Sequence, residues 1–222
     1  MSGLSPVERE KQLAASAAAE LVADGMTVGL GTGTTVAHLL TALAGRGLDI
    51  RCVATSPRTA AAARELGIPV ESFAGLDAPA HLDIAIDGAD QVDPDGWLVK
   101  GGGAAHTREK AVAAAAARFV VIVSADKLVE RITAPIPLEL ADYGLAATLA
   151  RLGDVSLRDV PRSPDGGVIA DYTGPVDDPA RLAARLSQTV GVVDHGLFPA
   201  AMVSDVVFAD GDAVEIRSVG AG

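Results

Sequence analysis

The sequence is organised around the segment IAIDGADQVDPDGWLVKGGGAAHTREK, residues 84–110 of a 222-residue chain. It begins as an apolar strand that ends in an acidic turn, Asp87-Gly88-Ala89-Asp90. A short strand follows and closes with Lys100, and three glycines then lead into a helix whose first turn contains Glu109. Strand ends and helix starts are where α/β proteins place their binding and catalytic groups. The segment therefore predicts an α/β fold with a functional site at one edge of a sheet.

Strands and helices alternate on both sides of this segment. Two of the predicted strands are near-continuous apolar runs, which are typical of strands covered on both faces. This alternation favours a Rossmann-like, mostly parallel sheet with right-handed crossovers. The predicted strands cover residues 26–30, 50–54, 82–86 and 119–123, and the predicted helices cover residues 5–23, 57–66 and a segment that ends near residue 46.

The texture of the sequence changes after residue 132, where prolines punctuate shorter elements. We expect strands near residues 155–160 and 167–172, helices near 143–152 and 179–189, and a terminal hairpin formed by 206–209 and 213–216. Two strands and two helices of this size suggest a small α+β (ferredoxin-like) lid domain inserted in the main one. The predicted division is residues 1–132 plus 206–222 for the catalytic domain and 133–205 for the lid.

Composition limits the possible partners. The formal net charge of −11 argues against nucleic acid or an anionic membrane as a partner. An acidic protein that binds an anion needs a local pocket of cations or backbone amides.

The single cysteine, Cys52, excludes an internal disulfide and is expected to be a buried thiol in the strand at 50–54. Charged residues at 8–11 leave no room for a signal peptide, and the small-apolar run at 111–117 is too short to cross a bilayer, so a cytoplasmic location is predicted.

A glycine–threonine loop, Gly31-Thr32-Gly33-Thr34-Thr35, follows the first predicted strand and opens a helix. Such a loop offers free backbone N–H groups, hydroxyls and a favourable helix dipole to an anion. A dinucleotide site would require a third glycine where Thr34 stands and an acidic residue at the end of the second strand, and a Walker loop would require Gly-Lys-Ser/Thr. A monophosphate is therefore the favoured ligand. The alternative is a turn that binds nothing.

The carboxylates allow a catalytic and a structural interpretation. Asp87 and Asp90 flank a tight turn and can face one polar ligand, or they can satisfy backbone donors as an Asx-type turn. Glu109 can act as a base or can simply stabilise the helix start. Lys100 closes a strand directly before the glycines and is expected to face the cleft. Together these groups offer acids and bases for proton transfer and a cation for an oxyanion.

The histidines show no metal-ligand spacing, and no metal site is predicted. They are His38, His81, His106 and His195. Only His106 lies near the predicted site, on the same helix face as Glu109, and contact between His106 and a substrate stays open as an alternative.

At this point the motifs resemble the ribose-5-phosphate isomerase A family over nearly the whole chain. The resemblance rests on the loop at 31–35, the turn at 87–90, the segments 100–103 and 107–110, and Ser124–Lys127, with weaker similarity at 137–139, 191–193 and 196–198. The order and spacing of these motifs are specific. The resemblance implies an aldose–ketose isomerase, without a cofactor, that interconverts ribose 5-phosphate and ribulose 5-phosphate through an enediolate. It also implies a homodimer or homotetramer.

The resemblance also implies roles for individual residues. The residue matching Glu109 is the base, those matching Asp87 and Asp90 bind the sugar and help to open its ring, and that matching Lys100 stabilises the oxyanion. The remaining implied substrate-binding residues are Thr32, Gly33, Thr34 and Thr35 at the phosphate, Gly88, Ala89, Gly101, Gly102 and Gly103 around the sugar, and Lys11 and Lys127.

The sequence departs from the family pattern at a few positions, and none of them removes an implied catalytic group. Thr34 replaces a usual serine, Gln91 a usual glutamate and His106 a usual leucine, and Ala125-Asp126 differs from the common Asp-Glu-Ser. Two alternative functions stay open. One is a non-catalytic sugar-phosphate sensor, and the other is an amino-sugar phosphate deaminase or acyl-CoA transferase of similar fold.

Overall fold

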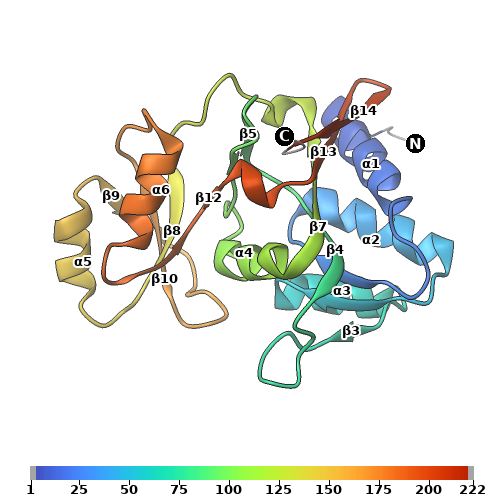
Figure 1. Cartoon of the computed structure of the whole chain (residues 1–222), viewed down its shortest axis with the longest axis horizontal. Coiled ribbons are helices and arrows are strands. Elements are labelled where there is room, and N and C mark those ends of the chain that lie inside the picture. The colour runs from blue at the N-terminus through green and yellow to red at the C-terminus, as the bar shows by residue number, and fades with distance from the viewer. Residues whose placement is uncertain (1–3, 220–222) are drawn as a thin grey trace.

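A seven-stranded sheet forms the centre of the computed structural model, which describes residues 4–219 (Figure 1). Neighbouring strands are parallel except for the antiparallel pair β13–β14 at one edge. This arrangement confirms the predicted mostly parallel α/β sheet. In spatial order the strands are β14 (Ala213–Ser218), β13 (Asp205–Asp210), β7 (Ala116–Ser124), β4 (Leu82–Asp87), β1 (Thr27–Leu30), β2 (Arg51–Ala54) and β3 (Val70–Glu71).

Helices cover both faces of this sheet. Small and branched side chains of α1 (Pro6–Ala19) and α2 (Thr34–Arg46) pack on one face, and α3 (Pro57–Glu65) adds Ala63 to the same core. On the other face, Val112 and Ala113 of α4 (His106–Ala115) pack against β4 and β7. Apolar burial on both faces explains the near-continuous hydrophobic runs of the central strands.

A second, four-stranded antiparallel sheet lies on the far side of α4, at the left of Figure 1. It carries α5 (Leu145–Leu152) and α6 (Pro179–Ser187) and has its own apolar core. Its strands, in spatial order, are β11 (Val192–His195), β8 (Ile136–Leu140), β10 (Val168–Tyr172) and β9 (Val155–Leu157).

A small three-stranded sheet lies between the two large ones. It consists of β12 (Leu197–Phe198), β6 (Leu98–Val99) and β5 (Gln91–Val92), and two short 3-10 helices, η1 (Ala125–Lys127) and η2 (Ala200–Met202), flank the large sheet. Strand β12 follows β11 of the four-stranded sheet in the chain. Its pairing with β6 therefore links the end of the four-stranded sheet to the segment that holds Lys100. The amide of Lys100 donates to the carbonyl of Gly196 at 2.9 Å, which extends this link.

Several predicted bounds were wrong. The first helix ends at Ala19 and not near residue 23, because the amides of Leu21 and Val22 bond to carbonyls three residues earlier and tighten the chain into turns. The sheet of the smaller unit has four strands where two were predicted. The interior strand β8 was missed because it contains Pro137, which has no amide donor, and a proline usually indicates the end of a strand. Residues 1–3 and 220–222 of the predicted catalytic domain lie outside the described residues.

Candidate active site

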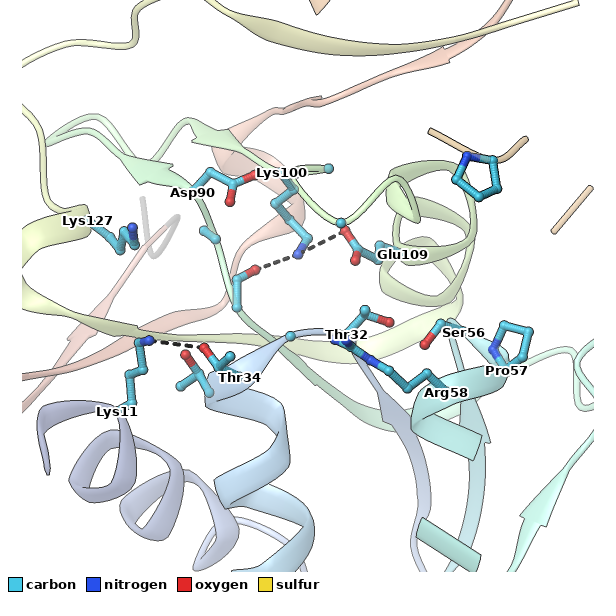
Figure 2. A pocket seen from close by; sticks show the side chains of 18 residues that line it. Lys11, Thr32, Thr34, Ser56, Pro57, Arg58, Asp90, Lys100, Glu109 and Lys127 are labelled. Atoms are coloured by element: carbon cyan, nitrogen blue, oxygen red, sulfur yellow. Dashed lines mark hydrogen bonds and ion pairs between the residues drawn. The ribbon is translucent and has the colours of Figure 1, made fainter. Parts of the chain in front are cut away.

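The centre of the site is a buried lysine between two carboxylates. Lys100 Nζ lies 2.9 Å from Asp87 Oδ2 and 3.1 Å from Glu109 Oε2, and it also donates to the carbonyl of Gly88. Asp87 ends β4, Lys100 directly follows β6, and Glu109 lies in the first turn of α4. All three residues are at most 5% exposed to solvent. Three separate elements therefore converge on one cluster of charges, of which Figure 2 shows Lys100 and Glu109.

This cluster has one negative charge too many when every group is ionised. Burial and the charge of Asp87 raise the pKa of Glu109, Lys100 opposes both effects, and the net result is a pKa of about 8. Burial also raises the pKa of Asp87. Burial alone would lower the pKa of Lys100, but its two carboxylate partners raise it above the ordinary value. The lysine therefore stays charged, and the raised pKa of Glu109 favours a proton on this carboxyl group near neutral pH.

The glycine bend between Lys100 and α4 shapes the rim of the site. Gly101 has a φ of 106°, and a Cβ there would lie 2.6 Å from the ring of His106, so only glycine fits. The amide of Gly102 donates to Asp90 Oδ2 at 2.7 Å, and this bond turns the exposed Asp90 over the cavity. Asp90 thus satisfies a backbone donor and still lines the cavity, so the two interpretations of this carboxylate are compatible.

The glycine–threonine loop lies at the other end of the site, between β1 and α2. Gly31 passes so close to Asp87 that a Cβ would overlap the carboxylate, and the amide of Thr32 donates to Asp87 Oδ1 at 3.0 Å. Gly33 begins α2 without a side-chain cap, which leaves amides of the first turn open toward the cavity. Lys11 reaches from α1 and donates to the hydroxyl of Thr34 at 3.0 Å.

These groups surround one cavity of about 750 Å³. Asp87 is the one predicted site residue that does not line it, because this residue lies buried beneath Lys100 and the loop. Three lining residues come from the N-cap and first turn of α3, directly after β2, and a fourth, Pro161, comes from the segment between β9 and β10. The predicted residues that line the cavity are Lys11, Thr32, Gly33, Thr34, Thr35, Gly88, Ala89, Asp90, Lys100, Gly101, Gly102, Gly103, Glu109 and Lys127, and those that were not predicted are Ser56, Pro57, Arg58 and Pro161.

The missed residues had a signal in the sequence. Strand β2 lies beside β1 in the sheet, so the turn that follows β2 must lie beside the glycine–threonine loop. Thr55 Oγ1 lies 2.8 Å from Thr32 Oγ1, which joins the two turns. The lack of an acidic residue at the end of β2 argues against a dinucleotide, but the turn there still contributes Ser56 to the cavity.

The histidines lie away from the cavity. His106 is fully buried behind Gly101 and does not line the cavity, and burial lowers its pKa to about 4. A direct contact between His106 and a ligand in this cavity is therefore not supported. Cys52 is buried and free, as predicted for its strand.

Residues 4–219 contain neither a metal-binding cluster nor a helix that could span a membrane. No group of three or more histidine, cysteine, aspartate or glutamate side chains in that range could hold a metal ion. None of the helices in the same range is long and apolar enough to span a membrane.

Comparison with known proteins identifies the family. The family profile described as "Ribose 5-phosphate isomerase A (phosphoriboisomerase A)" matches residues 51–213. A profile described as "DeoR C terminal sensor domain" matches residues 7–76. The ribose-5-phosphate isomerase A of Caulobacter vibrioides is 48% identical over 205 residues, which cover 85% of this chain and 89% of that protein.

Solved structures agree with the sequence comparison. The ribose 5-phosphate isomerase A from Neisseria gonorrhoeae superimposes with a TM-score of 0.89 at 29% identity, covering 95% of this chain and 96% of that one. A D-ribose-5-phosphate isomerase in complex with phospho-erythronic acid gives a TM-score of 0.87 at 33% identity, covering 96% and 99%. With its motifs, its fold and its full-length relatives all in agreement, the chain belongs to the ribose-5-phosphate isomerase A family.

Proposed function

We infer that this chain is an aldose–ketose isomerase that interconverts D-ribose 5-phosphate and D-ribulose 5-phosphate. The observation that carries this inference is the contact of one buried lysine, Lys100, with two carboxylates at the floor of the cavity. An enediolate mechanism needs a base for a carbon-bound proton and a fixed cation for the oxygen that becomes negative. Glu109 and Lys100 provide both within 3.1 Å of each other.

The proposed reaction moves one proton between neighbouring carbons. The ionised Glu109 removes the proton from C2 of the open-chain aldose, and the C1 oxygen becomes the negative oxygen of the enediolate. A proton then passes from the C2 hydroxyl to the C1 oxygen, and the carboxyl group of Glu109 returns its proton to C1 to give the ketose. Lys100 stabilises the negative oxygen of the enediolate between these steps. Asp90, which lines the cavity, contacts the sugar hydroxyls and assists ring opening, whereas the buried Asp87 acts through its ion pair with Lys100. No step requires a cofactor.

The phosphate group is proposed to bind at the opposite end of the cavity. The uncapped start of α2 lies there, Thr34 and Thr35 line the cavity, and Lys11 already contacts Thr34. Lys127 lines the same cavity from η1. A monophosphate at this end leaves the reacting carbons free to approach Glu109 (Figure 2).

We also propose a lid, an oligomeric state and a cellular location for this chain. Residues 133–205 form a lid over the cavity, supported by Pro161, which lines the cavity from that side. The chain forms a homodimer or homotetramer, supported by the exposed Val190 and Val193 beside and on the edge strand β11. It acts in the cytoplasm, consistent with the unpaired Cys52. Light scattering of the purified protein gives the oligomer size directly.

Turnover of ribose 5-phosphate in deuterated water tests the proposed reaction. Wild type is expected to give ribulose 5-phosphate with solvent deuterium at C1, and Glu109→Gln is expected to lose at least about a thousandfold in kcat. Mass spectrometry of the product and the remaining substrate measures both. A Glu109→Gln variant that retains wild-type turnover would exclude Glu109 as the base.

The sensor-domain match at residues 7–76 makes a non-catalytic sugar-phosphate sensor the second candidate. This segment contains the glycine–threonine loop but neither Lys100 nor Glu109. Saturable binding of ribose 5-phosphate by folded wild-type protein without any turnover would favour the sensor. Release of ammonia from an amino-sugar phosphate would instead favour the deaminase, and acyl exchange the transferase.

A further inference from the structure

Most cations of the active-site cavity are already paired with carboxylates. Lys100 is shared by Asp87 and Glu109, as described above. Lys11 Nζ lies 2.6 Å from a carboxylate oxygen of Glu8, and Lys127 Nζ lies 3.3 Å from Asp126. The cationic side chains that line the cavity are Lys11, Arg58, Lys100 and Lys127.

Arg58 differs from these lysines. Within residues 4–219, no carboxylate lies within 4.0 Å of its guanidinium group, so its charge is not neutralised by an ion pair. The chain as a whole carries a net charge of −11, and its substrate phosphate carries about −1.5 to −2 near pH 7. Anion binding in such a protein depends on local positive charge that is free to pair.

The position of Arg58 directs this charge at the glycine–threonine loop. Arg58 lies in the first turn of α3, directly after the capping Ser56 and Pro57. Figure 2 shows its side chain extending from α3 toward Thr32 and the start of α2. Arg58 also lines a neighbouring cavity of about 310 Å³ together with Gly33 and Thr34. The same three residues line the active-site cavity, so Arg58 lies beside the start of α2 in both cavities.

We propose that Arg58 is a substrate-binding residue that donates to the phosphate group at the glycine–threonine loop and favours phosphorylated over unphosphorylated sugars. Guanidinium groups bind phosphate oxygens through two parallel hydrogen bonds, and such charge-assisted bonds are stronger than neutral ones. The neighbouring amides of α2 then complete the coordination of the anion. This proposal rests on the proposed function, because it takes the phosphate group to lie at that loop.

Binding of a non-reacting ligand pair tests the proposal without requiring turnover. The probes are phospho-erythronic acid and erythronic acid, which differ only in the phosphate group. We expect Arg58→Gln to weaken binding of phospho-erythronic acid by about tenfold to a hundredfold, the range for a hydrogen bond to a charged group. Erythronic acid binding should not change. Titration calorimetry of both ligands at constant ionic strength measures each Kd.

Arg64→Gln is the matched control, because Arg64 lies on the same helix but does not line the cavity and donates instead to the carbonyl of Val70. Its Kd for both ligands should equal that of wild type. The KM for ribose 5-phosphate should rise in Arg58→Gln by the same factor as the Kd of phospho-erythronic acid, with kcat changed less than about threefold.

Two results would overturn the assignment of Arg58. One is an unchanged Kd for phospho-erythronic acid, and the other is an equal loss for both ligands, which would place Arg58 on another part of the sugar acid. A failure of the proposed isomerase function would give a result that differs from both of these. Wild type would then bind phospho-erythronic acid without isomerising ribose 5-phosphate, and the comparison between Arg58→Gln and wild type would still measure the contact to phosphate.

Discussion

Replacing Asp87 by asparagine should shift the pH dependence of catalysis toward lower pH. Asp87 and Glu109 share one lysine, and burial together with the charge of Asp87 raises the pKa of Glu109 to about 8. Asparagine keeps the side-chain oxygen that accepts from the amides of Thr32 and Gly88 but removes the negative charge. Lys100 then has a single carboxylate partner, and the ionised form of Glu109 is favoured.

The size of the shift follows from Coulomb's law. Two unit charges about 5 Å apart interact by about 3 kcal/mol at an effective dielectric constant of about 20. This energy corresponds to about two pKa units. We therefore expect the pKa of Glu109 to fall from about 8 in wild type to about 6 in Asp87→Asn.

Two measurements check this shift. In wild type, kcat/KM should rise about tenfold per pH unit up to about pH 8 and then level off, because only ionised Glu109 removes a proton. In Asp87→Asn the plateau should begin about two units lower, at a reduced height. Because the phosphate of the substrate also titrates near pH 6, the carboxyl resonance of Glu109 in the free protein provides an independent value.

Asp93→Asn is the control variant. Asp93 is a buried carboxylate that accepts from the amide of Trp97 and does not line the cavity, so its removal should leave the pH profile unchanged. A wild-type profile that is flat between about pH 6 and about pH 9 would contradict the raised pKa of Glu109. A profile that rises as expected but does not move in Asp87→Asn would contradict the coupling through Lys100.

Three further predictions concern stability and packing. Glu109 has its ordinary pKa of 4.5 in the unfolded chain, and the folded chain binds the same proton more tightly. The free energy of unfolding should therefore fall as pH rises from about 5 to about 8. Urea unfolding should show this slope in wild type but not in Glu109→Gln. Gly31→Ala places a Cβ against Asp87 and should lower kcat by at least about a hundredfold while the protein stays folded by circular dichroism. Lys110→Met leaves the carboxylate of Asp194 without its ion pair and should lower the free energy of unfolding by about 1.5–3 kcal/mol in a denaturant titration.

The convergence of the main site residues could be predicted from sequence because it follows from topology. Asp87 ends β4, and the loop that starts at Gly31 directly follows the neighbouring parallel strand β1, so both lie where the carboxyl ends of the strands meet. The same rule would have found Ser56 and Arg58, because β2 is the next strand along. The misplaced first-helix end had a local cause. Short-range turn bonds compete with the helix there and leave no distinct pattern in the sequence.

The charge state of the site could not be predicted in this way. The sequence shows that Lys100 precedes a glycine bend, but the number of carboxylates within reach of its ammonium group depends on side-chain packing. Burial, the helix dipole and a neighbouring cation shift the pKa of Glu109 in different directions, so only the geometry decides the outcome. In the structure, burial and the second carboxylate outweigh Lys100.

The contribution of the four-stranded sheet to the site also depends on packing between segments that lie far apart in the sequence. Helix α4 lies between the two larger sheets (Figure 1), and the unit formed by the four-stranded sheet contacts it at three positions in its first turns. Thr107 donates to the buried Glu139, Arg108 pairs with Asp165 at 2.7 Å, and Lys110 pairs with Asp194.

Glu109 lies between these contacts in the sequence but points the other way, toward Lys100. The backbone that carries the proposed base is therefore held from one side by the small unit, while its carboxyl group faces the cavity from the other. A rigid base within hydrogen-bond reach of its substrate is what proton transfer from carbon requires. The unit formed by the four-stranded sheet thus contributes to the geometry of the site through its contacts with α4.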